Sequence, residues 1–461
     1  MNRYRYYSVI AVAIVLIPLM SCDKEFLEKR PNSTITIPST LEDFQKLLDV
    51  DSYMRETPAF GDLSSDDYYI KYDNWNGLKK IHEKNCYIWN KEIYNGVEKI
   101  SDWNLPYQQV FYANVVLEGL ANIEVNASNQ SFYNNIKGSA LFIRAFAFYN
   151  LAQAYSPMYD ESAASNMYGI PLRLTAGIDD KTERSTVKVT YDRIINDLIE
   201  AKNLLQVQVP ELNRNRPSKP AATALLARAF LSMRDYKMAG QYADSTLAIY
   251  NKLIDYNTIS LSSTNPFTKF NVESIYQSCV LSESTVIASL RVTAGFFVDT
   301  TILSSYVAND LRKQIYYTAA GNLKGSYNER VRFSGFATDE VYLIRAECYA
   351  RAGKVTEAMK DLNDLLKTRW RKVSGQTTFV DYVATDGADA LRQVLVERRK
   401  ELILRGLRWS DLRRLNKEGA NITLKRILNG VTYTLPPNDP RYVAPIPNDV
   451  IAFSGIEQNI R

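Results

Sequence analysis

Two groups of carboxylates are the side chains in this sequence best suited to acid–base chemistry. Glu397 and Glu401 are one helical turn apart, so a helix would place both on the same face. Arginines surround this pair, at positions 398, 399, 405, 408, 413 and 414. Because a neighbouring guanidinium keeps a carboxylate ionised and hydrogen-bonded, these acids suit ion pairs better than proton donation. We therefore expect a structural clamp between C-terminal helices.

The second group is Asp66 and Asp67, which are adjacent in the chain. On a strand their side chains would point to opposite faces, whereas a glycosidase needs two carboxylates about 5 to 10 Å apart across a cleft. His82 is the single histidine, which excludes a zinc site built on paired histidines. The sequence has no Gly-x-Ser-x-Gly elbow and no phosphate-binding glycine loop. We expect no enzyme activity and no cofactor, and we name no metal-ligating residues, although the sequence leaves open whether a structural metal ion is bound; a surface glycosidase is the enzyme alternative.

Cys22 is the residue most clearly placed for a covalent modification. Arg3 and Arg5 precede an apolar run from Val9 to Met20, and the run ends at Ser21-Cys22. A bilayer-spanning helix needs roughly 20 apolar residues, so this shorter run indicates a secretion signal. The segment resembles a bacterial lipobox, which predicts a lipoprotein signal peptide over residues 1–21 and acylation of Cys22. The alternative is an ordinary signal peptide that is cut elsewhere.

Composition narrows the class of the mature protein. Loss of Arg3 and Arg5 with the signal peptide lowers the formal net charge from +5 to +3, and the basic residues are interspersed with acids. Nucleic acid is therefore not an expected partner. Cys86, Cys279 and Cys348 are odd in number and match no metal or redox spacing, so we expect unpaired thiols. The 31 tyrosines favour wide amphipathic contact surfaces.

Hydrophobic periodicity predicts a mainly α-helical protein with a large irregular lobe that carries short strands. We predict one domain over residues 22–461. Its helical scaffold lies mainly in residues 40–50, 103–154, 191–250, 338–370 and 388–416. Its irregular lobe comes from residues 51–102, 255–335 and 420–461, and Val431, Tyr433 and Leu435 alternate as in a strand.

A faint repeat lies within the predicted helices. Two segments share small and aromatic residues at the same offsets: Ala227, Phe230, Ala239 and Ala243, and Ala346, Tyr349, Ala358 and Leu362. Ala145 and Phe148 begin the pattern a third time, and a helix over 191–205 is its expected continuation. Small residues let two antiparallel helices approach closely while the ring fills the gap between pairs. The spacing resembles tetratricopeptide helix pairs.

The ordered set of motifs resembles the SusD/RagB family over the whole mature chain. The residues that carry the resemblance are Cys22; Trp103, Tyr107 and Asn114; Ser305-Tyr306 and Asp310-Leu311-Arg312; Glu397-Arg398-Arg399-Lys400-Glu401-Leu402; Gly406, Arg408 and Asp411-Leu412-Arg413; and Tyr442 to Ile451 with Asn459. The resemblance implies a lipoprotein on the outer face of the outer membrane. It would bind a glycan and deliver it to a SusC-like, TonB-dependent transporter. A helical-repeat lipoprotein that binds peptides or scaffolds membrane assembly is the alternative.

The resemblance also suggests where a ligand would bind: in the loops before the Trp103 helix and in the later insertion. Aromatic rings cover the apolar face of a sugar, and polar side chains satisfy its hydroxyls. The candidate residues are Asp67, Tyr72, Trp75, Asn76, Lys80, Tyr276, Phe296 and Phe297. Trp75 could instead pack beneath its own loop. Phe296 and Phe297 could belong to the core, since adjacent rings on a strand face opposite ways.

Overall fold

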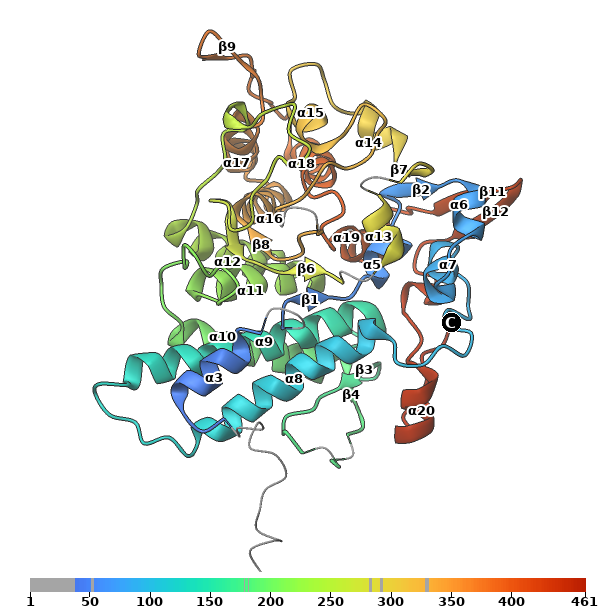
Figure 1. Cartoon of the computed structure of the whole chain (residues 1–461). Coiled ribbons are helices and arrows are strands. Elements are labelled where there is room, and N and C mark those ends of the chain that lie inside the picture. The colour runs from blue at the N-terminus through green and yellow to red at the C-terminus, as the bar shows by residue number, and fades with distance from the viewer. Residues whose placement is uncertain are drawn as a thin grey trace, which may run out of the picture. The chain divides into compact units, whose positions relative to one another are not determined.

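The computed structural model describes residues 38–461 except 51–53, 178, 181, 282–283, 291–292 and 328–330. The predicted signal peptide and Cys22 lie outside the described residues. Thr40–Arg461 form one compact unit (Figure 1). Its longer helices are α3 (Leu41–Leu48), α8 (Ser101–Leu120), α9 (Gln130–Tyr155), α10 (Val187–Leu204), α11 (Lys219–Met233), α12 (Tyr236–Ile249), α16 (Thr338–Arg351), α17 (Val355–Lys367), α18 (Gly387–Glu401) and α19 (Arg408–Lys417). The predicted mainly α-helical fold class is confirmed.

The first helix shows how local sequence sets an element. The Thr40 hydroxyl accepts a hydrogen bond from the backbone N–H of Asp43 and so caps α3. Leu41, Phe44 and Leu48 follow at helical spacing, and all three are buried. This amphipathic stripe packs α3 against α8 and α9.

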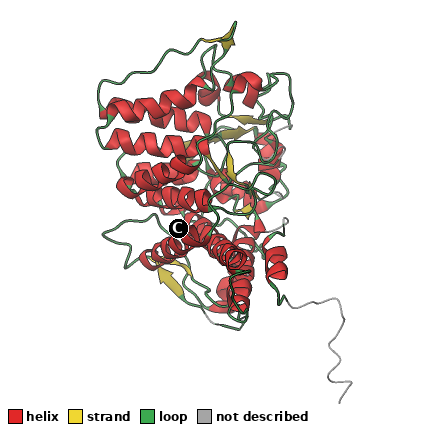
Figure 2. Cartoon of the chain, turned by 90° about the vertical axis from the view of Figure 1, so that its left-hand side faces the viewer, coloured by secondary structure: helices red, strands yellow, loops and turns green. Residues whose placement is uncertain are grey.

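Consecutive helices pack in pairs, as the repeat predicts. The contacts run from α9 to α10, α11 to α12 and α16 to α17, and α12 also packs on α16. Figure 2 shows long helices stacked side by side. The small residues of the repeat lie at these contacts. Ala227, Ala239, Ala243, Ala346 and Ala358 are all fully buried. The alanines therefore serve close helix packing rather than an open groove along the helices.

Short elements build the rest of the unit. The short helices are α5 (Phe60–Ser64), α6 (Tyr72–Asn76), α7 (Ile81–Tyr87), α13 (Thr285–Ser289), α14 (Thr300–Ser304), α15 (Arg312–Tyr316) and α20 (Asn448–Ser454), with 3-10 turns at Tyr256–Thr258 and Pro440–Tyr442. The strands are β1 (Glu56–Thr57), β2 (Tyr68–Ile70), β3 (Tyr168–Pro171), β4 (Arg184–Thr186), β5 (Ser274–Tyr276), β6 (Cys279–Val280), β7 (Phe296–Val298), β8 (Phe336–Ala337), β9 (Lys372–Val373), β10 (Gln376–Thr377), β11 (Leu424–Leu428) and β12 (Val431–Leu435).

These strands form two-stranded ladders rather than one sheet. The pairs are β1–β6, β2–β7, β3–β4, β5–β8, β9–β10 and β11–β12, and β1–β6 is parallel while the others are antiparallel. The strand expected at Val431, Tyr433 and Leu435 is β12, which pairs with β11 in a hairpin. Asn429 and Gly430 both have positive φ at its turn, as a two-residue hairpin turn requires.

A buried cluster of arginines and carboxylates joins the lobe to the helices. Arg312 and Arg369 are fully buried, and both donate hydrogen bonds to Glu401 of α18. Arg369 also binds Glu273 at 2.8 Å, and Arg312 binds Asp310 at 2.7 Å. Burial alone would raise the pKa of Glu401, but the charges of the two arginines outweigh it and lower the pKa. Glu401 thus stays ionised, as expected for a clamp.

The same kind of contact ties α18 to α19. Arg398 of α18 and Arg414 of α19 both bind the carboxylate of Asp411, at 2.9 and 2.8 Å. Arg414 continues to Glu347 on α16. The clamp predicted between C-terminal helices is therefore present, and it extends further along the chain than the local motif indicates.

The three described cysteines are unpaired, as expected. Burial raises the pKa of Cys348 to about 12, which suits a packing role between α12 and α16, where its Cβ lies close to Gly240. Among the residues that the structure describes, no helix combines the length and hydrophobicity that a membrane-spanning segment requires.

Candidate functional site

The strand pair β2–β7 brings together the two segments in which we expected a ligand site. Tyr69 lies directly opposite Phe297 in the antiparallel register, and their rings stack with centroids 5.3 Å apart at 28°. Side chains alternate across a strand, so Tyr68 and Ile70 are buried while Tyr69 is 38% exposed. The ladder thus presents two adjacent rings on its outer face.

A second set of contacts holds the loop after β2 against the segment before β7. The Lys71 N–H donates to the carbonyl of Gly295, and the Asn74 side chain donates to the carbonyl of Ala294. Gly295 has a φ of +92°, and a Cβ at this position would collide with the Asn74 side-chain oxygen. Only glycine fits both the backbone conformation and the close approach.

The stacked rings lie at the edge of a groove of about 910 Å³, which we call the aromatic groove. Residues of β2, β7, α14 and α15, together with the segments that follow the two helices, line it; these elements are labelled in the upper right of Figure 1. The polar and aromatic lining residues are Tyr69, Phe297, Thr300, Tyr306, Asp310, Lys313, Gln314, Tyr317, Thr318 and Lys324. A groove of this volume is large enough to contact several sugar units of a glycan, whereas a single ion would fill only a small part of it.

Buried polar contacts fix the helices that border the aromatic groove. Asp299 caps α14 by accepting from the Thr301 N–H. At the start of α15, Arg312 is held in the buried ionic cluster, whereas the next residues, Lys313 and Gln314, are exposed. The ionic cluster therefore orients α15 so that its polar side chains face the groove.

Asp310 is the carboxylate among the lining residues, and it is not placed for acid catalysis. Its side chain has no exposed surface and accepts two hydrogen bonds from Arg312, at 2.9 and 2.7 Å. A glycosidase would need a second carboxylate across the cleft. Burial also raises the pKa of Tyr306 and Tyr317 well above the ordinary tyrosine value, so both rings stay neutral. The aromatic groove offers contact surface and hydrogen bonds.

Among the predicted site residues, Phe297 lines the groove and Tyr72 does not. Tyr72 is 38% exposed on α6, which directly follows β2. Asn76 is exposed, and its oxygens accept from the ammonium of Lys84. Lys80 is half-buried at the start of α7. Tyr72, Asn76 and Lys80 thus belong to α6 and the start of α7, and they do not line the groove.

The structure places four predicted residues where they do not present a surface to a ligand. Trp75 packs beneath its own loop: it is 9% exposed, its indole N–H donates to the Lys84 carbonyl, and the Lys84 ammonium lies 4.6 Å from a ring centroid. Phe296 points inward from β7, opposite its neighbour Phe297, and is 4% exposed. We therefore remove Trp75 and Phe296 from the candidate site.

The other two are Tyr276 and Asp67. Tyr276 is 1% exposed and packs edge-on against Phe142 of α9 at 4.8 Å, so it belongs to the core. Asp67 is also 1% exposed and accepts from Arg399 and from the backbone of Leu404. These buried contacts fix the chain at the start of β2.

Sequence reasoning missed Tyr69 and most of the groove lining. Tyr68, Tyr69 and Ile70 are all aromatic or apolar, so the sequence does not tell the exposed side chain from the buried ones; the pairing of β2 with β7 decides it. Lys313, Gln314 and Lys324 likewise carry no pattern that indicates the groove. They reach the groove because the chain between 300 and 327 folds back beside β7.

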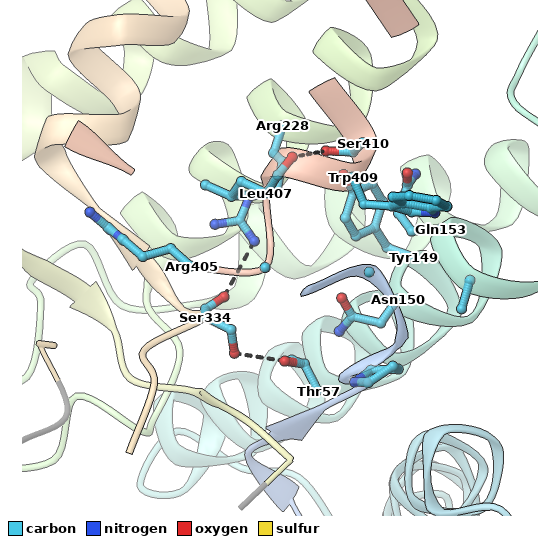
Figure 3. A pocket seen from close by; sticks show the side chains of 14 residues that line it. Thr57, Tyr149, Asn150, Gln153, Arg228, Ser334, Arg405, Leu407, Trp409 and Ser410 are labelled. Carbon is cyan, nitrogen blue, oxygen red and sulfur yellow. Dashed lines mark hydrogen bonds between the residues drawn. The ribbon is translucent and has the colours of Figure 1, made fainter. Parts of the chain in front are cut away.

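A second cavity is too small for a sugar. It has a volume of about 50 Å³ and lies between α9, α11 and the start of α19. Figure 3 shows its polar side chains turned toward one another: the Thr57 hydroxyl donates to Ser334 at 2.7 Å, and Arg228 donates to the Ser334 carbonyl. A polar cavity of this volume has room for a few water molecules.

Comparison with known proteins agrees with the fold. Residues 25–231 match the family model described as "Starch-binding associating with outer membrane", and residues 311–459 match the SusD family model. The chain belongs to the SusD/RagB family. The second match includes α15, which lines the aromatic groove, and Glu397 and Glu401 of the ionic cluster that holds Arg312.

SusD-type relatives cover almost the whole chain. SusD-like protein P38 of Formosa agariphila is 20% identical in an alignment of 513 positions that covers 94% of this chain and 95% of that protein. A solved putative sugar binding protein from Bacteroides vulgatus is 22% identical, with a TM-score of 0.72 over 92% of this chain and 99% of that chain. A SusD superfamily structure from Bacteroides fragilis is 21% identical, with a TM-score of 0.73 over 91% and 99% of the two chains. At this identity the likeness establishes the fold.

Proposed function

We propose that this SusD family protein is a lipid-anchored, non-catalytic glycan-binding protein of the outer membrane that hands its ligand to a SusC-like, TonB-dependent transporter. The observation that carries the proposal is the stacked pair Tyr69 and Phe297 at the edge of the aromatic groove. The family description, starch binding in association with the outer membrane, supports both the ligand class and the location.

The chemistry of the groove suits a sugar chain. A pyranose has an apolar face of C–H bonds and a rim of hydroxyls, and flat rings cover the first while Thr300, Gln314 and Thr318 offer partners for the second. If one ring removes about 100 Å² of apolar surface from water, it contributes roughly 2.5 kcal/mol. Two rings, after the entropy cost of binding, give an affinity of about millimolar to micromolar. Such weak binding suits a protein that must release its ligand to a transporter.

The alternatives explain the groove less well. A glycosidase would use Asp310, which is locked in ion pairs. A peptide-binding helical repeat would use the inner faces of the helix pairs, where the alanines are fully buried.

Loss of the two groove rings is the direct test. We expect Tyr69→Ala and Phe297→Ala each to weaken binding of a retained polysaccharide about tenfold, because each removes one sugar-stacking surface. The measurement is affinity gel electrophoresis across a panel of plant, algal and host polysaccharides, followed by calorimetry on the polymer that retards the wild type. Phe453→Ala is the matched control, since Phe453 is an exposed ring on α20, outside the groove. Equal retardation of all four proteins would remove the aromatic groove as the site.

The anchor has its own test. We expect the wild-type protein to fractionate with the outer membrane and to need detergent for release, and Cys22→Ala to lose this attachment, because two or more acyl chains are needed for stable anchoring. Cys86→Ala is the control, because Cys86 is a buried thiol of the folded unit. A Cys22→Ala protein that stays with the membrane would contradict lipid anchoring at this residue.

A further inference from the structure

We propose that the aromatic groove selects an anionic glycan, one that carries carboxylate or sulfate groups, over a neutral one. This inference rests on the proposed function, because it assigns a ligand class to the same groove. The inference rests on a stacked ring pair that cationic side chains border. The carboxylate in the groove lining, Asp310, is already paired with Arg312.

Lys313 is the first of these cations. It lies on α15 between the buried Arg312 and Gln314, lines the groove and is exposed. None of the ion pairs between described residues includes Lys313. Lys324 lines the same groove and donates to the carbonyls of Leu261 and Gln314, both at 2.7 Å. Two ammonium groups therefore belong to the groove lining.

Two further cations flank the lining. Lys71 is exposed at the end of β2, and its ammonium lies 5.6 Å from the centroid of the Phe297 ring. Arg371 donates to the side-chain oxygen of Gln314 at 3.0 Å, from the base of the β9–β10 hairpin. Lys71 thus lies beside the ring pair, and Arg371 contacts Gln314 on the α15 side of the groove.

The carboxylates near the groove do not offset these charges. Asp310 is fully buried and bound by Arg312, and Lys400 lies 3.5 Å from it. Asp299 keeps its charge, but its carboxylate accepts from the N–H and the hydroxyl of Thr301 at the start of α14, and it is not part of the groove lining. Among the lining side chains, two ammonium groups face one carboxylate, and Arg312 already pairs with that carboxylate. A uronic acid or a sulfated sugar keeps the apolar ring face that stacks on Tyr69 and Phe297 while adding the anion that these cations attract.

The expected contribution of each cation is modest, as for any solvent-exposed ion pair. We expect Lys313→Gln to weaken binding of an anionic polymer about threefold to fivefold, and the Lys71→Gln, Lys313→Gln double variant about tenfold or more. Binding should also weaken as the salt concentration rises, because the charges of the exposed Lys71 and Lys313 are screened by salt. Binding of a neutral polymer should not change.

Two matched pairs of probes separate charge from sugar shape. Polygalacturonate and its methyl ester share a backbone and differ in carboxylate charge; dextran sulfate and dextran differ in sulfate. Affinity gels and calorimetry at low and high salt would be run on wild type, Lys313→Gln, the double variant and Lys237→Gln. Lys237 is the matched control, since it is an exposed lysine on α12. The first pair reports a carboxylate preference and the second a sulfate preference.

Retention of the charged member of either pair over its neutral partner, lost in the groove variants and kept in Lys237→Gln, supports the inference. Equal binding of charged and neutral partners overturns it, and so does an equal loss in the Lys237→Gln control, which would indicate general ion exchange. Wild-type binding to neutral polymers of the wider panel alone, lost on Tyr69→Ala, overturns the anionic preference and leaves the proposed function standing. Failure to bind any polymer in either panel counts against both.

Discussion

Replacement of Arg369 by methionine is expected to lower the free energy of unfolding by about 3 to 5 kcal/mol. The Arg369 side chain is fully buried and donates to Glu273 and Glu401, and its guanidinium lies 4.1 Å from the centroid of the Tyr256 ring. Methionine fills much of the volume, but it removes the ion pair of Glu273 and leaves Glu401 paired with Arg312 alone. A buried charge that loses its partner costs far more than the intact pair contributes.

The measurement is urea unfolding followed by circular dichroism. A Glu273→Gln, Arg369→Met double variant should recover part of the loss, because neutral glutamine needs no counter-charge. Lys360→Met is the surface control: its pair with Asp364 is exposed, so its removal should change stability by less than about 0.5 kcal/mol. A loss below about 1 kcal/mol for Arg369→Met would show that the ionic cluster does not hold the lobe to the helices.

Asp62 gives the second large effect, a loss of stability as pH rises. Asp62 lies on α5 with 1% exposure; one carboxylate oxygen accepts from the Gly406 N–H, and the other has no hydrogen-bond partner among the described residues. Burial, reinforced by the nearby charge of Asp67, raises the pKa of Asp62 to about 7. The carboxyl is therefore neutral in the folded protein at pH 5.

The sign of the effect follows from proton binding. An unfolded aspartate has a pKa of about 3.9, so between about pH 4 and 7 the folded chain holds a proton that the unfolded chain has lost. Stability therefore falls as pH rises through this window, by about 2 to 4 kcal/mol. An asparagine side chain cannot ionise. We expect the stability of Asp62→Asn relative to the wild type to increase from pH 5 to pH 8, with the variant the more stable protein at pH 8.

Urea unfolding at pH 5, 6.5 and 8 would measure this difference. Asp192→Asn is the control, because Asp192 pairs with Lys188 on the exposed face of α10 and its loss should leave the pH dependence unchanged. Parallel stability curves for wild type and Asp62→Asn would refute a buried neutral carboxyl at this position.

The parts of the fold that could be predicted are those whose signal is local. Thr40 caps a helix whose apolar residues recur at helical spacing, and the buried alanines of α11 and α12 follow the repeat. Val431, Tyr433 and Leu435 alternate as a strand, and the residues before them include a hairpin turn. In the helices the residues that define the element are also the buried ones, whereas in β12 Leu435 is buried and Val431 is exposed.

The candidate site could be predicted only as a pair of regions. Tyr276 and Tyr69 are both tyrosines in strand-like surroundings, yet the first is core and the second is exposed, because long-range packing decides which face is buried. The pairing of β2 with β7 joins segments with no turn between them to indicate it. Trp75 is covered by Lys84, a contact within one loop that composition does not indicate. Partners of the clamp such as Arg369 and Glu273 likewise come from distant segments.

Arg312 is buried and its neighbour Lys313 is exposed, and this difference has a consequence for the evolution of the groove. Arg312 is anchored inside and sets the position of α15, whereas Lys313 and Gln314 are exposed beside it. Under the proposed function, substitutions at the outward positions would change the sugar preference without weakening the buried contacts of Arg312. A lineage would then adapt to new polymers by exchanging a few surface side chains while the buried support of α15 stays intact.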